Sequence, residues 1–242
     1  AVERSGKIVI EAENVDFSWQ QQPIVKDFSC QIQRGDKIGI IGPNGCGKST
    51  LIQLLLSNIK PQSGTIRTGT KLEVAYFDQH RNELDLTKSV RNNMADGSDN
   101  VIINGISKHV VGYLKDFLFS PSQMNTPVSA LSGGERNRLM LAKLFTKPFN
   151  FLIMDEPTND LDIDTLELLE ELLMDFQGTL LLVSHDRAFI NHIVDNCFVF
   201  EGNAIVNEYV GGYDDWLRQK PAETKKESDN KGTNSKDQQL KP

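Results

Sequence analysis

One stretch of nine residues constrains this chain more than any other. Residues 42–50 read Gly-Pro-Asn-Gly-Cys-Gly-Lys-Ser-Thr, which fits the pattern G-x-x-x-x-G-K-[ST]. The apolar residues 38–41 before it are typical of a strand, and residues 51–56 after it are typical of a helix. Glycines in such a turn let backbone N–H groups gather at the positive end of the helix. The stretch therefore predicts a loop that binds phosphate groups.

The last residues of this loop specify the ligand further. Lys48 supplies a compact positive charge for the β- and γ-phosphates of a nucleotide, and the Ser49 hydroxyl is suited to Mg²⁺. An ordinary glycine turn would leave this Lys-Ser pair unexplained. Cys46 lies beside Lys48 and a helix N-terminus, so we expect its thiol to favour the thiolate. The nucleotide-binding residues predicted in the loop are Gly42, Pro43, Asn44, Gly45, Cys46, Gly47, Lys48, Ser49 and Thr50.

Composition limits the environment and the partners. The 242 residues carry a net charge of −7, which argues against a surface broadly coated for nucleic acid but leaves room for a local patch. No apolar run approaches the roughly 20 residues of a membrane span, and no basic-then-apolar signal segment opens the chain. The three cysteines are odd in number and lack metal-site spacing, which fits a reducing compartment. We therefore expect a cytoplasmic location.

The order of patterns predicts an α/β fold. Alternating apolar residues between 7 and 33 indicate antiparallel strands ahead of the loop. Later apolar runs, such as 151–154 and 178–183, read as buried parallel strands. Between the phosphate loop and these later runs, residues 84–95 and 110–118 have helical spacing, and Asn104-Gly105 signals a tight hairpin. We expect a mixed or parallel sheet core with helices, an N-terminal antiparallel β subdomain and an inserted, mostly helical lobe.

Two of the apolar strands end in residues that carry chemistry. Asp155 and Glu156 end the first, where Asp155 suits Mg²⁺ through water and Glu156 suits the work of a general base. His185 follows the next strand, where we expect it to contact a γ-phosphate, although a lone histidine is more often structural.

A second anion site is predicted at a helix N-terminus. Ser132 followed by Glu135 fits a capping box, and Gly133 and Gly134 leave the backbone N–H groups of that turn exposed. The alternative is simply a well-capped helix.

Five features stand in a diagnostic order: the loop at 42–50, Gln79, Leu-Ser-Gly-Gly-Glu at 131–135, the strand with two acids at 151–156, and His185. Over residues 7–218 this order resembles the ATP-binding cassette (ABC) family. The resemblance implies a phosphate-loop NTPase of ABC type, with residues 80–147 as a helical subdomain and with ATP and Mg²⁺ as ligands. It also implies a head-to-tail pair of cassettes. In that pair, ATP lies between the loop of one cassette and Ser132, Gly133 and Gly134 of the other.

The resemblance also implies roles for single residues. Glu156 is similar to the catalytic carboxylate, His185 to the switch histidine, and Gln79 to a ligand of Mg²⁺ alongside Ser49 and Asp155. Trp19 resembles the aromatic residue that stacks on adenine, and its alternative is core packing with neighbouring apolar residues. Lys48 joins Glu156 and His185 as a catalytic residue, and residues 159–162 resemble the D-loop.

Two further segments resemble the ABC-F branch, namely 156–162 (Glu-Pro-Thr-Asn-Asp-Leu-Asp) and 209–216. Members of this branch lack membrane domains and carry two cassettes in one chain, and the similarity here is to the second cassette of a bacterial member. The resemblance implies an ATPase that pairs with a second cassette, of the same full-length chain or of a homodimer for an isolated fragment. It further implies action on ribosomes or branched DNA.

Two alternatives stay open beside that expectation. The first is the nucleotide-binding subunit of a membrane ABC transporter. The second is a nucleotide-regulated binding module that does not hydrolyse ATP, against which the presence of Lys48, Glu156 and His185 argues.

The two ends of the chain differ in composition from its middle. Residues 1–6 read as the remnant of a linker. Residues 219–242 are rich in Lys, Glu, Asp, Asn, Ser and Gln, which predicts a disordered linker toward a C-terminal domain missing from this sequence.

Overall fold

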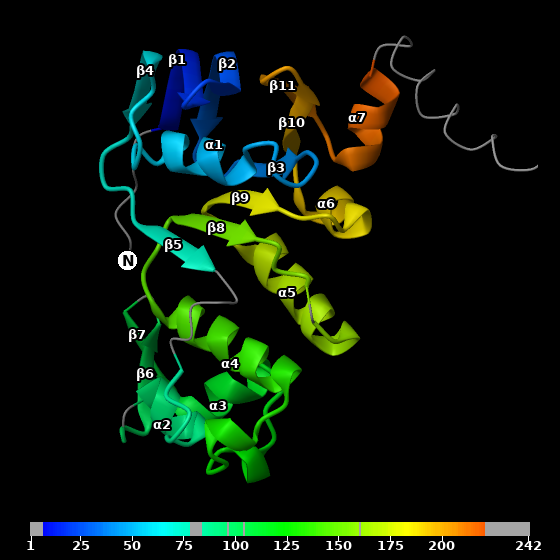
Figure 1. Ribbon diagram of the computed structural model, residues 1–242. Helices are drawn as coiled ribbons and strands as arrows, with labels where there is room; N and C mark the ends of the chain where they lie inside the picture. The colour runs from blue at the N-terminus through cyan, green and yellow to red at the C-terminus, as the bar shows by residue number, and fades with distance from the viewer. Residues whose placement is uncertain (1–6, 78–83, 96, 104, 160, 221–242) are drawn as a thin grey trace, which may run out of the picture.

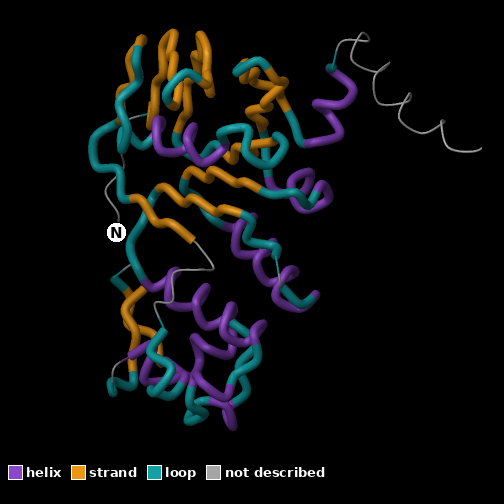
Figure 2. The backbone as a smooth tube through the Cα atoms, viewed as in Figure 1, coloured by secondary structure: helices purple, strands orange, loops and turns teal. Residues whose placement is uncertain are grey.

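The computed structural model describes residues 7–77, 84–95, 97–103, 105–159 and 161–220. These residues form a small antiparallel sheet, a larger mixed sheet and a mainly helical lobe. In Figure 1 the lobe lies at the bottom, and the larger sheet extends from the middle up beside the small sheet at the top. The tube in Figure 2 shows that helices gather in the lower lobe and strands in the upper part.

The small sheet consists of β1 (Ile8–Trp19), β2 (Gln22–Gln33) and β4 (Ser63–Thr68) in the order β2-β1-β4. Both pairings are antiparallel, as the alternating pattern predicts. β1 is a single strand that changes register between Ala12 and Val15, where Asn14 has a positive φ of 47°. This bulge lets β1 bend along its length and bring Trp19 toward the phosphate loop.

The larger sheet has six strands in the order β11-β10-β3-β9-β8-β5. All neighbours pair in parallel except β10 and β11, which form an antiparallel hairpin. This arrangement confirms the predicted α/β class with a mixed sheet. The strands are β3 (Lys37–Ile41), β5 (Val74–Phe77), β8 (Phe151–Asp155), β9 (Thr179–Val183), β10 (Asn196–Gly202) and β11 (Ile205–Val210).

Helices cover both faces of this sheet. α1 (Lys48–Leu55) lies between the two sheets (Figure 1), and its four buried apolar residues pack in one cluster with Leu181 of β9. Leu180 and Leu182 belong to the opposite cluster, with α5 (Ile163–Asp175) and α6 (Arg187–Ile193). Successive strand residues therefore serve two separate layers of core, which explains why the parallel strands are apolar without interruption. α7 (Tyr213–Gln219) ends the described part of the chain.

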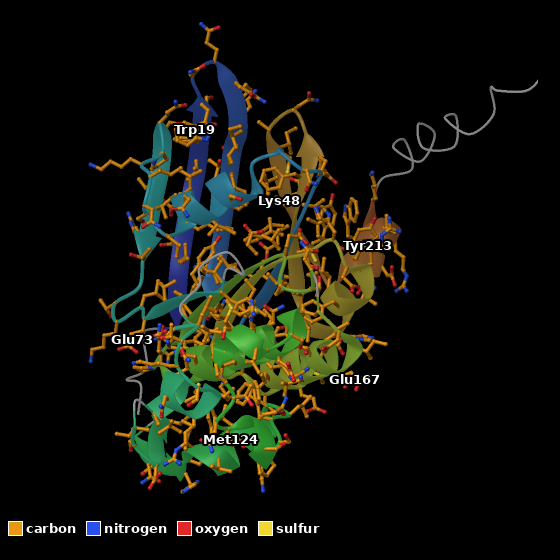
Figure 3. The ribbon with its side chains drawn as sticks, turned by 60° about the horizontal axis from the view of Figure 1, so that its bottom comes forward. Trp19, Lys48, Glu73, Met124, Glu167 and Tyr213 are labelled. Atoms are coloured by element: carbon orange, nitrogen blue, oxygen red, sulfur yellow. The ribbon has the colours of Figure 1, made fainter. Side chains whose placement is uncertain are left out.

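The lower lobe buries its own apolar side chains, including Met124, which Figure 3 places far from Trp19. The predicted hairpin is present as β6 (Asn100–Ile103) paired antiparallel with β7 (Ile106–His109), although Asn104 itself lies outside the described residues. The helical elements are α2 (Val90–Ala95), α3 (Val110–Asp116), two short 3₁₀ turns (Pro121–Gln123 and Val128–Ala130) and α4 (Gly133–Thr146).

α4 is the longest helix of the described residues, at 14 residues. Among the helices in the described part of the chain, none combines the length and the apolar composition needed to cross a bilayer.

The helix predicted over residues 84–95 begins only at Val90, so the prediction is wrong for its first half. The cause is local hydrogen bonding. The backbone N–H of Thr87 donates to Asp85 Oδ1 at 3.0 Å, which forms a turn, and the side chain of Asn93 exchanges hydrogen bonds with the Asp85 backbone at 2.9 Å. Short polar side chains that bond to nearby backbone compete with the helix in this way.

Replacement of Leu181 by alanine tests the two-layer core. Leu181 is fully buried in the central strand β9, so Leu181→Ala leaves a cavity and should lower the free energy of unfolding by about 2–5 kcal/mol. The matched control is Ile102→Ala, because Ile102 is 68% exposed and its loss should change that free energy by less than about 0.5 kcal/mol. Urea denaturation of both variants measures the difference, and equal midpoints would contradict this account of the core.

Candidate functional site

The loop at residues 42–50 connects the end of β3 to the start of α1, and two of its three glycines, Gly42 and Gly47, have no room for side chains. Gly47 has a φ of 114°, and a Cβ there would lie 2.3 Å from Ile24 Cγ2 of β2. At Gly42 a Cβ would lie 2.9 Å from the Cβ of Phe200 in β10. The loop is thus pressed between β2 and β10, and only glycine allows this approach.

The Lys48 side chain folds back over the loop. Its Nζ donates to the carbonyl oxygens of Gly42 at 2.8 Å and Pro43 at 3.3 Å. This places the ammonium group at the centre of the loop, in the middle of the upper part of Figure 3. A cation held there by two carbonyl groups is suited to a polyanionic ligand.

A cavity of about 420 Å³ opens beside this lysine and collects most of the predicted site residues. Its lining includes Ser49 and Asp155, the two predicted Mg²⁺ ligands that fall within the described residues, and also Glu156. The sequence did not single out Gln22 and Ile24, which lie on its wall. The full lining is Trp19, Gln22, Ile24, Asn44, Gly45, Gly47, Lys48, Ser49, Thr50, Asp155 and Glu156.

Trp19 stands at this cavity, half exposed, with its indole held in place. Its Nε1 donates to Thr50 Oγ1 at 3.1 Å, and its ring meets Phe17 edge to face at a centroid distance of 5.0 Å. Phe17 is buried, whereas Trp19 is 52% exposed, so core packing does not account for this tryptophan. Its exposure and its fixed orientation suit a ring that stacks on a planar ligand.

Glu156 and His185 meet because β8 and β9 are neighbours in register, with Asp155 opposite Val183. Glu156 has a positive φ of 50°, and its N–H donates to the Val183 carbonyl at 2.8 Å. Its Oε2 accepts from the His185 backbone N–H at 3.2 Å, while its Oε1 is buried without a hydrogen bond. A strained backbone and an unsatisfied carboxylate oxygen at one residue are typical of functional sites.

The His185 ring spans the gap between Glu156 and the phosphate loop. Its Nε2 lies 2.7 Å from Asn44 Oδ1 and 3.3 Å from Glu156 Oε1. The Asn44 contact is a hydrogen bond, whereas the Glu156 oxygen and the ring nitrogen are close but not aligned for a hydrogen bond. The ring is therefore held mainly by Asn44, a contact that the sequence pattern did not indicate.

The capping box predicted at residues 132–135 is present at the start of α4. The Ser132 N–H donates to Glu135 Oε2 at 2.8 Å, and the Glu135 N–H donates to Ser132 Oγ at 3.3 Å. The hydrogen bond from the Ser132 backbone holds the pKa of Glu135 below its usual value. Ser132, Gly133 and Gly134 are not part of the lining of the Lys48 cavity, so one chain does not bring the two predicted anion sites together.

Gly134 lies against Asp162, which joins two parts of the site. A Cβ at Gly134 would lie 2.3 Å from Asp162 Oδ2. Asp162 also caps α5 by accepting from the Thr165 N–H at 2.8 Å, and its carboxylate pairs with Arg138 of α4 at 3.2 Å. The hydrogen bond with Thr165 and the charge of Arg138 lower the pKa of Asp162. Asp162 is the last residue of the predicted D-loop, and the sequence indicated neither this cap nor this link between α4 and the loop after Glu156.

The thiolate predicted at Cys46 is wrong. Burial raises the pKa of this thiol above its ordinary value, and that effect outweighs the nearby charge of Lys48. The sulfur packs at the base of the loop, where it would lie 2.7 Å from a Cβ at Gly42. Cys46 is therefore part of the packing that holds the loop in shape.

Some predicted residues lie outside the described part of the chain. These are Gln79, Asp160 of the predicted D-loop, and the ends at 1–6 and 221–242. Among the described residues, no group of three His, Cys, Asp or Glu side chains could hold a metal by itself. Any Mg²⁺ held by Ser49 and Asp155 would thus need further oxygen ligands from water or from a bound phosphate, as is usual for this ion.

Comparison with known proteins agrees with this geometry. The family profile described as "ABC transporter" matches residues 25–159. The chain is 61% identical over 216 residues to "ATP-binding protein Uup" of Haemophilus influenzae, covering 89% of this chain and 33% of the relative. It is also 61% identical over 212 residues to Uup of Escherichia coli, covering 88% and 33%. The chain thus spans about a third of the length of these relatives.

The fold is shared with a solved structure, cbiO1 from Clostridium perfringens, described as part of the ABC transporter complex cbiONQ. The TM-score is 0.64 at 23% sequence identity, and the match covers 88% of this chain and 94% of the other. Together with the family match, this confirms the fold class predicted from the sequence.

Replacement of Gly134 by alanine tests the contact with Asp162. The new methyl group would displace the carboxylate that caps α5, which should make Gly134→Ala about 1–2 kcal/mol less stable than Gly133→Ala. Gly133→Ala is the matched control, because a Cβ at Gly133 meets nothing within 4 Å and alanine favours the helix. Urea denaturation compares the two. A Gly134→Ala chain as stable as Gly133→Ala would contradict the link.

Proposed function

Since this chain belongs to the ABC transporter family of ATP-binding domains, we propose that it is a cassette that binds and hydrolyses ATP and closes on a second cassette to do so. The observation that carries this proposal is that Lys48, Ser49, Asp155 and Glu156 line one cavity at the phosphate loop. A cation, a hydroxyl and two carboxylates in that arrangement suit a nucleotide triphosphate with its metal ion.

In this proposal the triphosphate lies along the loop and the adenine stacks on Trp19. Lys48 exchanges its bonds to the loop carbonyls for phosphate oxygens. Ser49 and Asp155 would hold Mg²⁺ with Gln79 as a further ligand, and the ion would neutralise charge on the β- and γ-phosphates. The donor set is all oxygen, which fits this hard cation.

Hydrolysis then needs a positioned water. Glu156 accepts one proton of that water while the oxygen of the water forms a bond to the γ-phosphorus. The bond between this phosphorus and the oxygen bridging it to the β-phosphate breaks, so ADP leaves with the electron pair and inorganic phosphate is formed. Lys48 and the Nε2–H of His185 stabilise charge on the γ-phosphate oxygens.

The second anion site completes a neighbouring nucleotide site. Ser132, Gly133 and Gly134 do not line the Lys48 cavity, so in this proposal they act on the nucleotide of a second cassette. A Cβ at Gly133 would meet nothing within 4 Å, which leaves the start of α4 open to an approaching partner. The partner is the other cassette of the same full-length chain, or a second copy when the fragment is alone.

The similarity to Uup proteins favours a cytoplasmic ABC-F role over transport. We propose that the pair of cassettes acts as a clamp on ribosomes or on branched DNA. Residues 7–218 would form the cassette, 80–147 its helical subdomain, and 1–6 and 219–242 parts of linkers. The alternative is the nucleotide-binding subunit of a membrane transporter. Full-length protein recovered with ribosomes or DNA favours the clamp, and recovery with membranes favours the transporter.

Substitution of Glu156 by glutamine tests the catalytic carboxylate. Glu156→Gln should keep ATP binding but lower turnover about a hundredfold or more, the scale of a lost general base. Glu167→Gln is the matched control, because Glu167 is exposed on α5 and does not line the cavity. Phosphate release measures turnover, and equilibrium binding of labelled ATP measures affinity. Turnover by Glu156→Gln at the wild-type rate would refute the role.

A complementation experiment tests the shared site. Lys48→Ala chains lack a working loop, and Ser132→Ala chains lack a working second site, so each alone should be a poor ATPase. A mixture can form one complete site from the intact halves, so its turnover should exceed that of both separate chains and should rise with concentration. Two results together would contradict the pairing of cassettes: a mixture with no more turnover than either variant alone, and full turnover by a wild-type chain that stays monomeric.

A further inference from the structure

Asn44 is the residue of the phosphate loop whose side chain turns toward His185. The two residues are 141 positions apart in the sequence, yet Asn44 Oδ1 lies 2.7 Å from His185 Nε2. Both oxygens near Nε2, Asn44 Oδ1 and Glu156 Oε1, are hydrogen-bond acceptors. The ring nitrogen between two acceptors carries the proton, so the neutral imidazole is the Nε2–H tautomer.

The two acceptors do not share that proton equally. Asn44 takes the short, well-aligned bond, whereas Glu156 Oε1 stays buried without a hydrogen bond only 3.3 Å from Nε2. A carboxylate is the stronger acceptor of the two, because its hydrogen bonds are charge-assisted. Without Asn44 the proton would therefore turn to Glu156.

We propose that Asn44 is a positioning residue, which holds the Nε2–H of His185 away from Glu156 and so keeps Glu156 Oε1 free to accept a proton from water. This inference rests on the proposed function for its catalytic consequence but not for its geometry. Asn44 acts through His185 and Glu156 and takes no part in the bond changes at phosphorus. Its value to the reaction is that the base stays unpaired until ATP and water occupy the site, when the Nε2–H of His185 passes from Asn44 to a γ-phosphate oxygen.

The kinetic test uses Asn44→Ala. Loss of Asn44 should lower kcat for ATP hydrolysis about tenfold, the scale of one hydrogen bond to a charged group, and should change KM much less. The effect should vanish in a His185→Ala background, because the residue acts through that ring. Asn92→Ala, at an exposed position of α2, is the matched control and should keep the wild-type kcat. Equal losses from Asn44→Ala with and without His185 would overturn the proposal.

A spectroscopic test needs no catalysis and separates this inference from the proposed function. Long-range ¹H–¹⁵N spectra of the imidazole rings, with His185→Gln to assign the signal, should place the wild-type ring in the Nε2–H tautomer. In Asn44→Ala the Nε2 resonance should move as the proton turns to a carboxylate, and Asn44→Gly, another truncation, should repeat this. Asn44→Ala combined with Glu156→Gln should not show that movement. An unmoved Nε2 resonance in Asn44→Ala would overturn the proposal, whatever the turnover of Glu156→Gln.

Discussion

The burial of α1 between the two sheets is the constraint on which the rest of the structure depends. All four of its core residues (Leu51, Ile52, Leu54 and Leu55) are completely buried. Since the helix begins at Lys48, fixing its axis also fixes the lysine and the turn before it. The strands on either side complete this support, because Ile24 of β2 and Phe200 of β10 approach the loop glycines closely. The antiparallel sheet is therefore part of the nucleotide site, and Trp19 reaches that site from the end of β1.

The sequence predicted best what depends on neighbours in the chain. The strand before the phosphate loop, the helix after it and the capping box at Ser132 all follow from local residue patterns, and the structure has all three. The hairpin around residues 103–106 was predictable for the same reason. The helix, the hairpin and the capping box use hydrogen bonds between residues only a few positions apart. The strand β3 pairs with the distant strands β9 and β10, but its apolar run beside the loop was enough to predict it.

The failures have a common physical origin in contacts that local patterns do not contain. At Asp85 the side chain bonds to the backbone of Thr87 and so forms a turn, which overrides a helical spacing of apolar residues. At Cys46 burial under the loop outweighs the charge of Lys48, which could not be weighed without knowing how deep the thiol lies. The bond between Asn44 and His185 depends on the order of strands in the sheet. A motif thus identifies the residues of this site more readily than their partners.

Asp162 shows how one such partner joins two regions that the motifs treat as separate. It follows Glu156 by six residues, and its carboxylate touches the start of α4 at Gly134 while it caps α5 and pairs with Arg138. At Asp162 the segment that follows Glu156 is therefore joined to the helix that carries the predicted second anion site. The Asp162 side chain is half exposed, so this link rests on its hydrogen bond from Thr165, its ion pair with Arg138 and its contact with Gly134. If the start of α4 serves a second cassette's nucleotide, as proposed, then Asp162 links the helix that contacts that nucleotide to the segment that follows the local Glu156.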